Sequence, residues 1–199
     1  MKDRRPRDKK QTKQDVISAA KKLFSENGLH GTSFRDIEKA SGVSKGLIIH
    51  HFETKENLYA VVQDNLNQEY TAWMAEQRET GKDLEEITVA AIRGSLSYIK
   101  NNPEFRRITL WSYLESQDRN TELDKRFTSI LIEAMRAGQE EGLIRDDVKA
   151  FVIPFIIRGA IDYWIRKESL REELSAEGQD DNVISDEELV NALVRFIFI

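Results

Sequence analysis

The chain contains no cysteine among its 199 residues, which excludes a disulfide framework and a thiolate zinc site. It also lacks any apolar run near the length of about 18 residues that a membrane-spanning helix needs. The N-terminal stretch MKDRRPRDKKQTK is basic and has no apolar centre, so it does not fit a secretory signal peptide. Together these absences predict a cytoplasmic protein with no membrane segment.

The short motifs of common enzyme classes are missing as well. No GxSxG, GxxxxGKS/T or HExxH pattern occurs. The run SGVSKG has neither the spacing nor the preceding strand of a phosphate-binding loop. His50 and His51 are adjacent, so on a helix their side chains point about 100° apart. No His, Cys or carboxylate four positions away completes a metal site around them. We therefore expect no catalytic residues, no metal and no cofactor.

Charge is distributed unevenly along the chain. Residues 1–55 hold 13 Lys and Arg against 7 Asp and Glu, a balance of +6, and the remaining residues hold 17 against 28, a balance of −11. A basic segment attached to an acidic remainder is typical of a DNA-binding head. Residues 1–11 are expected to be disordered. They fit a solvated basic tail as well as an arm that reaches phosphates or the minor groove.

Apolar residues at spacings of three and four predict an all-α protein of about nine helices, and no convincing β-alternation occurs. The acidic stretch 167–188 is predicted to be a loop. A capping box formed by Ser185 and Glu188 predicts the start of a last helix. The other predicted helices cover about 12–27, two short segments within 33–52, about 55–79, 83–100, 103–114, 121–141, and 148–169 with a kink at Pro154.

The stretch SFRDIEKASGVSKGLIIHHF, residues 33–52, has the pattern of two short helices joined by a tight turn. Ser33 is a candidate N-cap, and Asp36 three residues later completes a capping box. Gly42 supplies the positive φ that the turn needs, and Ser44 is a candidate cap for the second helix. This pattern indicates a helix-turn-helix, whose second helix presents its N-terminal residues to base edges in the major groove.

Residues from about 13 to 58 resemble the DNA-binding domain of the TetR family of bacterial transcriptional regulators. The chain departs from the family pattern where Glu38 and Ser41 replace Ala and where Ile49 replaces Tyr. Any single match is weak, but the ordered set at this spacing is specific. The matching residues are Phe24, Gly28, Gly31, Thr32, Ser33, Ile37, Gly42, Val43, Ser44, Lys45, Gly46, Phe52, Lys55 and Leu58.

The resemblance implies which residues contact DNA. Arg35 and Lys45 are candidates for hydrogen bonds to base edges. Leu47 and Ile49 are candidates for contact with thymine methyl groups, whereas Ile48 and Phe52 are expected in the core. The candidates for phosphate contact are Thr32, Ser33, His50, His51 and Lys55. For His50 and His51 the alternative is simple exposure. The full set of candidate DNA-binding residues is Thr32, Ser33, Arg35, Ser44, Lys45, Gly46, Leu47, Ile49, His50, His51 and Lys55.

The resemblance also implies a domain organisation. A helix-turn-helix domain at 12–70, with its motif at 33–52, follows the arm at 1–11 and is joined by a long fourth helix to a body at 71–199. In the family this body binds a small effector. Candidate pocket residues are Tyr98, Trp111, Tyr113, Phe127, Asp162 and Tyr163. The alternatives are that the aromatic residues are ordinary core and that Asp162 pairs with Arg158, four positions away.

The resemblance finally implies a homodimer joined through helices near 148–169 and 185–199, bound to a palindromic operator. The expected function is that of a repressor released by a small amphipathic or hydrophobic effector whose identity the sequence does not show. A ligand-independent regulator or an activator on the same fold is the first alternative. An enzyme or interaction protein on a helical scaffold is the second. The apolar end RFIFI suggests that the natural chain extends past Ile199.

Overall fold

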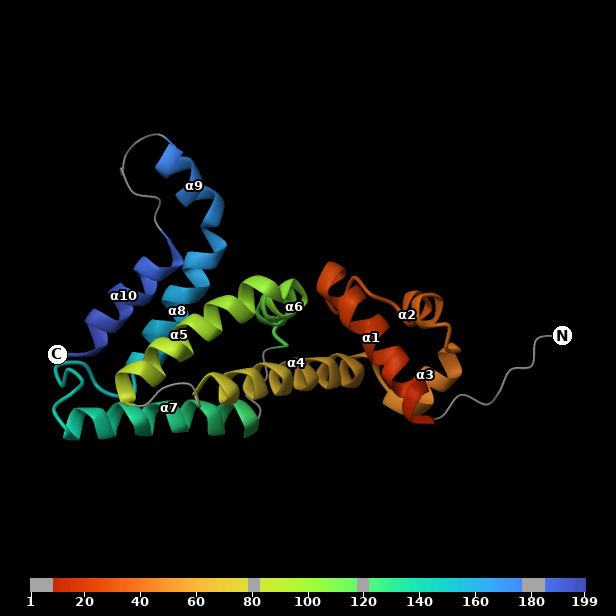
Figure 1. The fold of residues 1–199 in the computed structure, drawn as a ribbon. Coiled ribbons are helices and arrows are strands. Elements are labelled where there is room, and N and C mark those ends of the chain that lie inside the picture. Colours follow the sequence, from red (N-terminus) through yellow and green to blue (C-terminus); the bar gives the residue numbers. More distant parts are fainter. Residues whose placement is uncertain (1–8, 79–82, 118–121, 177–184) are drawn as a thin grey trace. The chain divides into compact units, whose positions relative to one another are not determined.

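The computed structural model describes residues 9–78, 83–117, 122–176 and 185–199 (Figure 1). Within these ranges the regular structure is entirely helical, apart from an isolated β-bridge between Ile144 and Phe198. The all-α prediction is confirmed. The helices are α1 (Lys9–Asn27), α2 (Phe34–Ser41), α3 (Lys45–Phe52), α4 (Lys55–Arg78), α5 (Leu84–Asn101), α6 (Pro103–Leu114), α7 (Glu122–Glu140), α8 (Ile153–Arg166), α9 (Glu168–Ala176) and α10 (Asp186–Ile197).

The chain divides into two compact units. The first comprises Met1–Glu69 and Asn102–Thr121, and the second comprises Tyr70–Asn101 and Glu122–Ile199. The division within α4 lies beside residue 70, where the sequence analysis placed its domain boundary. The first unit, however, also takes in α6, which the sequence analysis assigned to the body. This division reflects packing, so the functions predicted for the two domains stay predictions.

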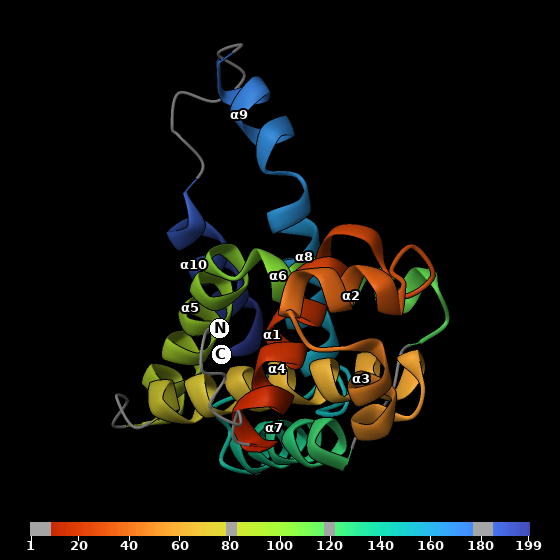
Figure 2. The ribbon, with the colours of Figure 1, turned by 90° about the vertical axis from the view of Figure 1, so that its right-hand side faces the viewer.

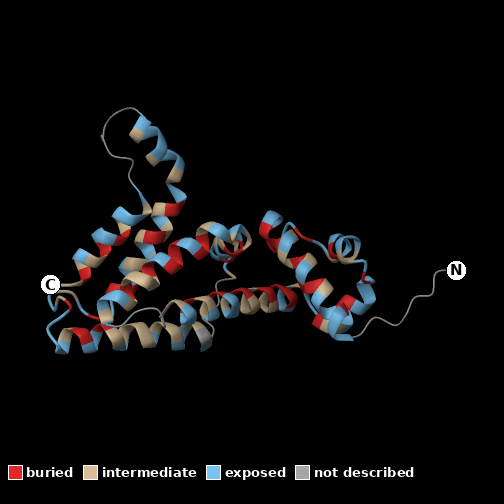
Figure 3. Ribbon diagram, viewed as in Figure 1, coloured by how far each residue is buried: buried red, intermediate tan, exposed pale blue. Residues whose placement is uncertain are grey.

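In the first unit, α1, α2 and α3 pack against one another, as the turned view of Figure 2 also shows. Val16, Phe24 and Ile37 are fully buried between these helices. The Phe24 ring meets the Tyr59 ring of α4 edge-on, with 4.9 Å between centroids. Buried residues follow the inner faces of the helices in Figure 3. Apolar burial of this kind is the main force that holds these helices together.

The start of α1 differs from the prediction. The helix begins at Lys9, so residues 9–11 of the predicted arm are helical, and the side chain of Thr12 is already buried. Residues 1–8 of the arm lie outside the described ranges. The buried Thr12 side chain stabilises the first turn of α1. Helix propensity alone did not indicate this earlier start.

In the second unit, α5 packs against α8 and α10, and α7 packs against α8. α10 begins with the predicted capping box, in which the Ser185 hydroxyl accepts from the Glu188 amide and the Glu188 carboxylate accepts from the Ser185 amide. Its first residue, Asp186, accepts hydrogen bonds from Lys100 and from the Trp164 indole, both at 2.9 Å. The capped end of α10 is therefore tied to α5 and α8 by a shared carboxylate.

Two predictions for the C-terminal third are wrong. The helix predicted at 148–169 with a kink at Pro154 begins only at Ile153, so Pro154 lies in the first turn, where its missing N–H requires no partner and produces no kink. The predicted loop at 167–188 contains helix α9, which raises the helix count of the described residues to ten. α9 has no buried residue, but its first residue, Glu168, forms an ion pair with Lys100 at 2.9 Å. Residues 177–184 lie outside the described ranges.

Candidate nucleic-acid interface

The turn between α2 and α3 is built as its local sequence predicts. The Ser33 hydroxyl accepts from the amide of Asp36 at 3.3 Å, and the Asp36 carboxylate accepts from the Ser33 amide at 3.0 Å. Hydrogen bonds from the Ser33 hydroxyl and amide lower the pKa of Asp36 below its ordinary value. Gly42 follows α2 with φ of 66°, the left-handed conformation that glycine adopts without strain. The capping box and the glycine turn are thus confirmed.

The start of α3 is capped from α2 rather than by its own N-cap residue. The Glu38 carboxylate accepts a hydrogen bond from the backbone amide of Lys45 at 3.0 Å, across the turn. Ser44 occupies the N-cap position in extended conformation, but its side chain makes no capping hydrogen bond. Glu38, one of the residues that depart from the family pattern, therefore caps the start of α3. The Ser44 hydroxyl takes no part in this capping.

α3 has one buried face and one exposed face. Ile48 and Phe52 are 0% and 4% exposed, as predicted for core residues. Leu47 and Ile49 are 40% and 38% exposed, so two apolar side chains of α3 are accessible to a partner. The candidate DNA-binding residues that are exposed are Ser33, Arg35, Ser44, Lys45, Gly46, Leu47, Ile49 and His50, and His51 is partly buried.

Two of the candidate phosphate ligands are engaged within the chain. The Thr32 side chain is 2% exposed, and its hydroxyl donates to the carbonyl oxygen of Gly28 at 2.8 Å. The Lys55 ammonium group donates to the carbonyl oxygen of Thr32 at 2.6 Å. These bonds fasten the start of α4 to the connection between α1 and α2. Thr32 therefore has a structural role. Its hydroxyl would have to give up the hydrogen bond to Gly28 in order to donate to DNA.

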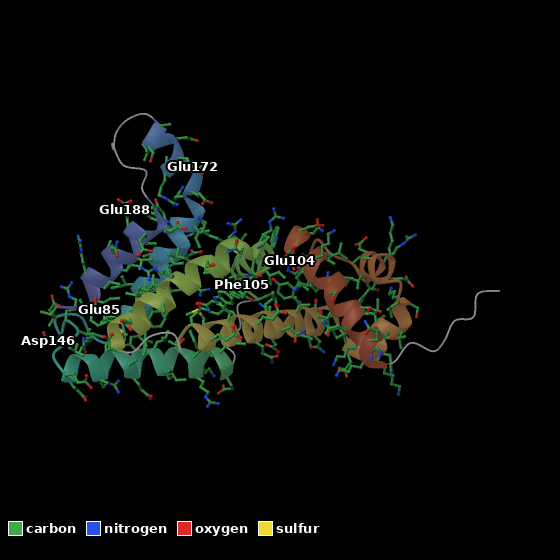
Figure 4. The ribbon with its side chains drawn as sticks, viewed as in Figure 1. Glu85, Glu104, Phe105, Asp146, Glu172 and Glu188 are labelled. Carbon is green, nitrogen blue, oxygen red and sulfur yellow. The ribbon has the colours of Figure 1, made fainter. Side chains whose placement is uncertain are left out.

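A further connection, which the sequence analysis missed, joins α6 to the end of α1. The Glu115 carboxylate, just after α6, accepts from the backbone amides of Leu29 at 2.8 Å and His30 at 3.0 Å. Gly28 lies beside it with φ of 71°, and a Cβ atom there would come within 2.7 Å of Glu115 and 2.9 Å of Trp111. At the other end of α6, Glu104 pairs with Lys21 of α1 at 3.4 Å (Glu104 is labelled in Figure 4).

The candidate pocket residues are divided between the two compact units. Trp111 and Tyr113 belong to the first unit, where Trp111 adjoins Gly28 and Tyr113 is 75% exposed. In the second unit Tyr163 is 58% exposed. Tyr98 and Phe127 both contact the ring of Tyr70, at centroid distances of 5.2 and 6.2 Å. Within the second unit, these two candidates therefore share an aromatic neighbour.

The alternative that Asp162 pairs with Arg158 is wrong. The Asp162 carboxylate pairs instead with Arg166, one turn further along α8, at 2.9 Å. Arg158 turns towards α4, where its guanidinium donates to the Tyr70 hydroxyl at 3.2 Å. Asp162 is four positions from both Arg158 and Arg166, so spacing in the sequence alone cannot choose between the two pairings.

The parts of the chain that the structure describes hold no cluster of three or more His, Cys, Asp or Glu side chains placed to bind a metal ion. Over the same residues, no helix combines the length and the apolar character required to cross a membrane.

Comparison with known families agrees with the helix-turn-helix geometry. Residues 16–62 match the family described as bacterial regulatory proteins, tetR family. Residues 83–195 match the Tetracyclin repressor-like C-terminal domain, which accounts for more than half of the chain. The chain therefore belongs to the tetR family, and it is a DNA-binding transcriptional regulator rather than an enzyme.

Individual relatives are similar over nearly the whole chain. The HTH-type transcriptional repressor AcnR of Corynebacterium diphtheriae is 27% identical over 189 residues, which cover 92% of this chain and 91% of AcnR. A TetR transcriptional regulator from Chloroflexus aurantiacus has a similar fold, with a TM-score of 0.73 and 22% identity over 96% of this chain and 98% of that one. So does AibR, solved in complex with isovaleryl coenzyme A and operator DNA, with a TM-score of 0.69 and 18% identity over 94% and 98% of the two chains.

Proposed function

We propose that the protein is a homodimeric repressor that binds a palindromic operator in the cytoplasm and is released from it by a small amphipathic or hydrophobic effector. The observation that carries the DNA-binding part is the division of α3 into two faces. Ile48 and Phe52 hold the helix in the first unit, whereas Lys45, Leu47 and Ile49 are exposed. A helix anchored on one side and bare on the other is able to enter the major groove.

The exposed side chains divide by chemistry into two roles. Arg35 and Lys45 carry donors that suit guanine O6 and N7, while Leu47 and Ile49 suit thymine methyl groups. Ser33, His50 and His51 carry polar groups suited to phosphate oxygens, which position the head without reading sequence. The balance of +6 over residues 1–55 supports this assignment, because phosphate neutralisation supplies much of the affinity.

Dimerisation is supported by apolar residues that α8 leaves exposed. Phe155 and Ile156 are 54% and 37% exposed, and Phe151, just before the helix, is 59% exposed. The Phe151 and Phe155 rings lie 5.3 Å apart, so they form one continuous apolar surface. Such a surface marks an interaction site. We assign it, together with α10, to a twofold interface that presents two copies of α3 to the two halves of a palindrome.

Release by an effector requires that the effector bind the body more tightly in the state that does not fit the operator. α4 would transmit the change, because it runs from the first compact unit into the second. AibR offers a precedent for operator DNA and a small ligand on a similar fold, and AcnR is a repressor by name.

The proposal is tested by selecting bound DNA from random fragments with the wild-type protein, Lys45→Ala and the charge-matched control Arg136→Ala. Arg136 is exposed, lies on α7 in the second unit and is outside the proposed dimer interface. We expect a palindromic consensus for the wild type and the control, and its loss for Lys45→Ala. Binding without a consensus in all three proteins would contradict sequence-specific recognition. Sedimentation of a monomer at micromolar concentration would contradict the dimer.

A further inference from the structure

Arg158 of α8 is a partly buried cation placed against a tyrosine. Its guanidinium donates to the Tyr70 hydroxyl at 3.2 Å, and its Cζ atom lies 5.4 Å from the centre of the Tyr70 ring. The Tyr70 hydroxyl shares a second hydrogen bond with the Ser95 hydroxyl at 2.9 Å. A guanidinium and two hydroxyl groups from α8, α4 and α5 thus converge within the second unit.

Aromatic rings adjoin this polar group. The centroid of the Tyr98 ring lies 5.2 Å from that of Tyr70 and 6.2 Å from that of Trp73. Phe127 contacts Tyr70 from α7 at 6.2 Å. Trp73 and Phe127 retain partial exposure. The arrangement has a cationic, hydroxyl-rich end and an aromatic end, which matches the two ends of an amphipathic molecule.

Arg158 has no anionic partner within the described part of the chain. Asp162, the carboxylate one turn further on α8, is already paired with Arg166 at 2.9 Å. The contacts of Arg158 are the hydrogen bond and the ring contact with Tyr70. A guanidinium has five donors in a planar fork that fits carboxylate and phosphate oxygens. Removing such a group partly from water without an anion is costly, and an anionic ligand offsets that cost.

We propose that Arg158, with the hydroxyl groups of Tyr70 and Ser95, binds the anionic head group of the effector, a carboxylate or a phosphate, while its apolar part lies against Tyr98, Trp73 and Phe127. This inference rests on the proposed function, because it names the chemical class of the effector that the repressor would bind. The polar and the aromatic groups lie in the second unit, so the ligand needs no group from the first.

The class is tested on the wild-type protein with four ligands that share one chain length: octanoate, octyl phosphate, octanamide and octylamine. Binding is followed by tryptophan fluorescence, because Trp73 belongs to the aromatic end, and by isothermal calorimetry. We expect at least one of the two anions to bind about tenfold or more tightly than the neutral amide and the amine. The tighter anion identifies the head group. If neither anion binds more tightly than octanamide, the proposal is overturned.

Three variants test whether the effect belongs to Arg158 and the Tyr70 hydroxyl. Arg158→Gln removes the charge, and we expect it to remove the preference for the anion over octanamide. Arg136→Gln removes a charge from an exposed position on α7 in the same unit, and it should keep the preference. Tyr70→Phe keeps the ring while removing the hydroxyl group, and we expect it to weaken anion binding without loss of the folded state. An anion preference that persists in folded Arg158→Gln would overturn the assignment.

Failure of this inference is distinguishable from failure of the proposed function. Operator binding is measured without ligand on the same proteins. Operator binding that is retained while the anions fail to bind would overturn the inference about Arg158 and leave the DNA-binding regulator intact. Anion binding with no operator binding would support the inference and contradict the repressor.

Discussion

The Glu38 carboxylate and the Lys45 amide form a 3.0 Å hydrogen bond that joins α2 to the first turn of α3. Lys45 is the first residue of the helix proposed to read DNA, so Glu38 positions that helix although it is not itself a candidate DNA-binding residue. The bond also explains why Ser44 can occupy the N-cap position without a side-chain cap. Since a free amide at a helix start is normally capped, the turn relies on Glu38 for this bond.

We predict that Glu38→Ala lowers the free energy of unfolding by about 1 kcal/mol, the typical cost of losing a cap. Operator affinity should fall while affinity for random DNA does not fall, because the substitution also removes a negative charge from the side of the protein that is proposed to face phosphates. Urea titration and fluorescence anisotropy with both DNAs measure the two effects.

Glu38→Gln is the matched control, because it keeps a carbonyl acceptor for the Lys45 amide and loses only the charge. It should restore most of the operator specificity that Glu38→Ala loses. Equal specificity in Glu38→Ala and the wild type would show that the bond does not position α3.

A second prediction concerns Glu115, whose carboxylate accepts from the amides of Leu29 and His30. Glu115→Ala leaves both amides without this acceptor, and we expect a loss of about 1–3 kcal/mol in the free energy of unfolding. Equilibrium urea unfolding measures it. Glu104→Ala, at the other end of α6, removes the partly exposed ion pair with Lys21, so it should cost about 0–1 kcal/mol. A similar loss in both variants would refute the role of Glu115.

The third prediction concerns acid stability. Burial raises the pKa of Asp186, but hydrogen bonds from Lys100 and Trp164 outweigh it, so the net effect is a pKa below the ordinary 3.8. A carboxyl group whose pKa is lowered on folding stabilises the protein above its unfolded pKa, and this stabilisation disappears as the pH falls through the folded value. Asp186→Asn should therefore be less stable than the wild type at pH values of about 6 and above.

The difference between Asp186→Asn and the wild type should shrink as the pH falls below about 4. Urea unfolding at several pH values tests this, with Asp146→Asn as a control, because Asp146 is exposed and outside this network. If the difference in unfolding free energy between Asp186→Asn and the wild type does not depend on pH, Asp186 contributes packing rather than charge.

Most of the DNA-binding head is predictable from its sequence, because the relevant interactions are local. The capping box of Ser33 and Asp36, the left-handed Gly42 and the buried faces of Ile48 and Phe52 each depend on residues within a few positions of one another. The capping box at Ser185 was predictable for the same reason. The roles of exposed residues such as Lys45 and Leu47 stay predictions, because exposure permits DNA contact without demonstrating it.

Errors arose where an interaction spans a long stretch of chain. α9 has no buried face to reveal it in the sequence, yet its first residue pairs with Lys100, 68 positions earlier. The acceptor for the Leu29 amide is Glu115, 86 positions away. Arg158 likewise bonds to Tyr70 rather than to the carboxylate one turn along its own helix.

The sequence by itself determined the helix-turn-helix, most of the other helices and the capping boxes at Ser33 and Ser185, because hydrophobic periodicity and capping are short-range effects. Only the tertiary structure decided that α6 packs with the DNA-binding unit and that Arg158 meets Tyr70, Ser95 and the aromatic rings. Those outcomes depend on which helix faces adjoin in space, and helical spacing fits several pairings equally well. Long-range packing selects one of them, through burial and through hydrogen bonds between residues far apart in the chain.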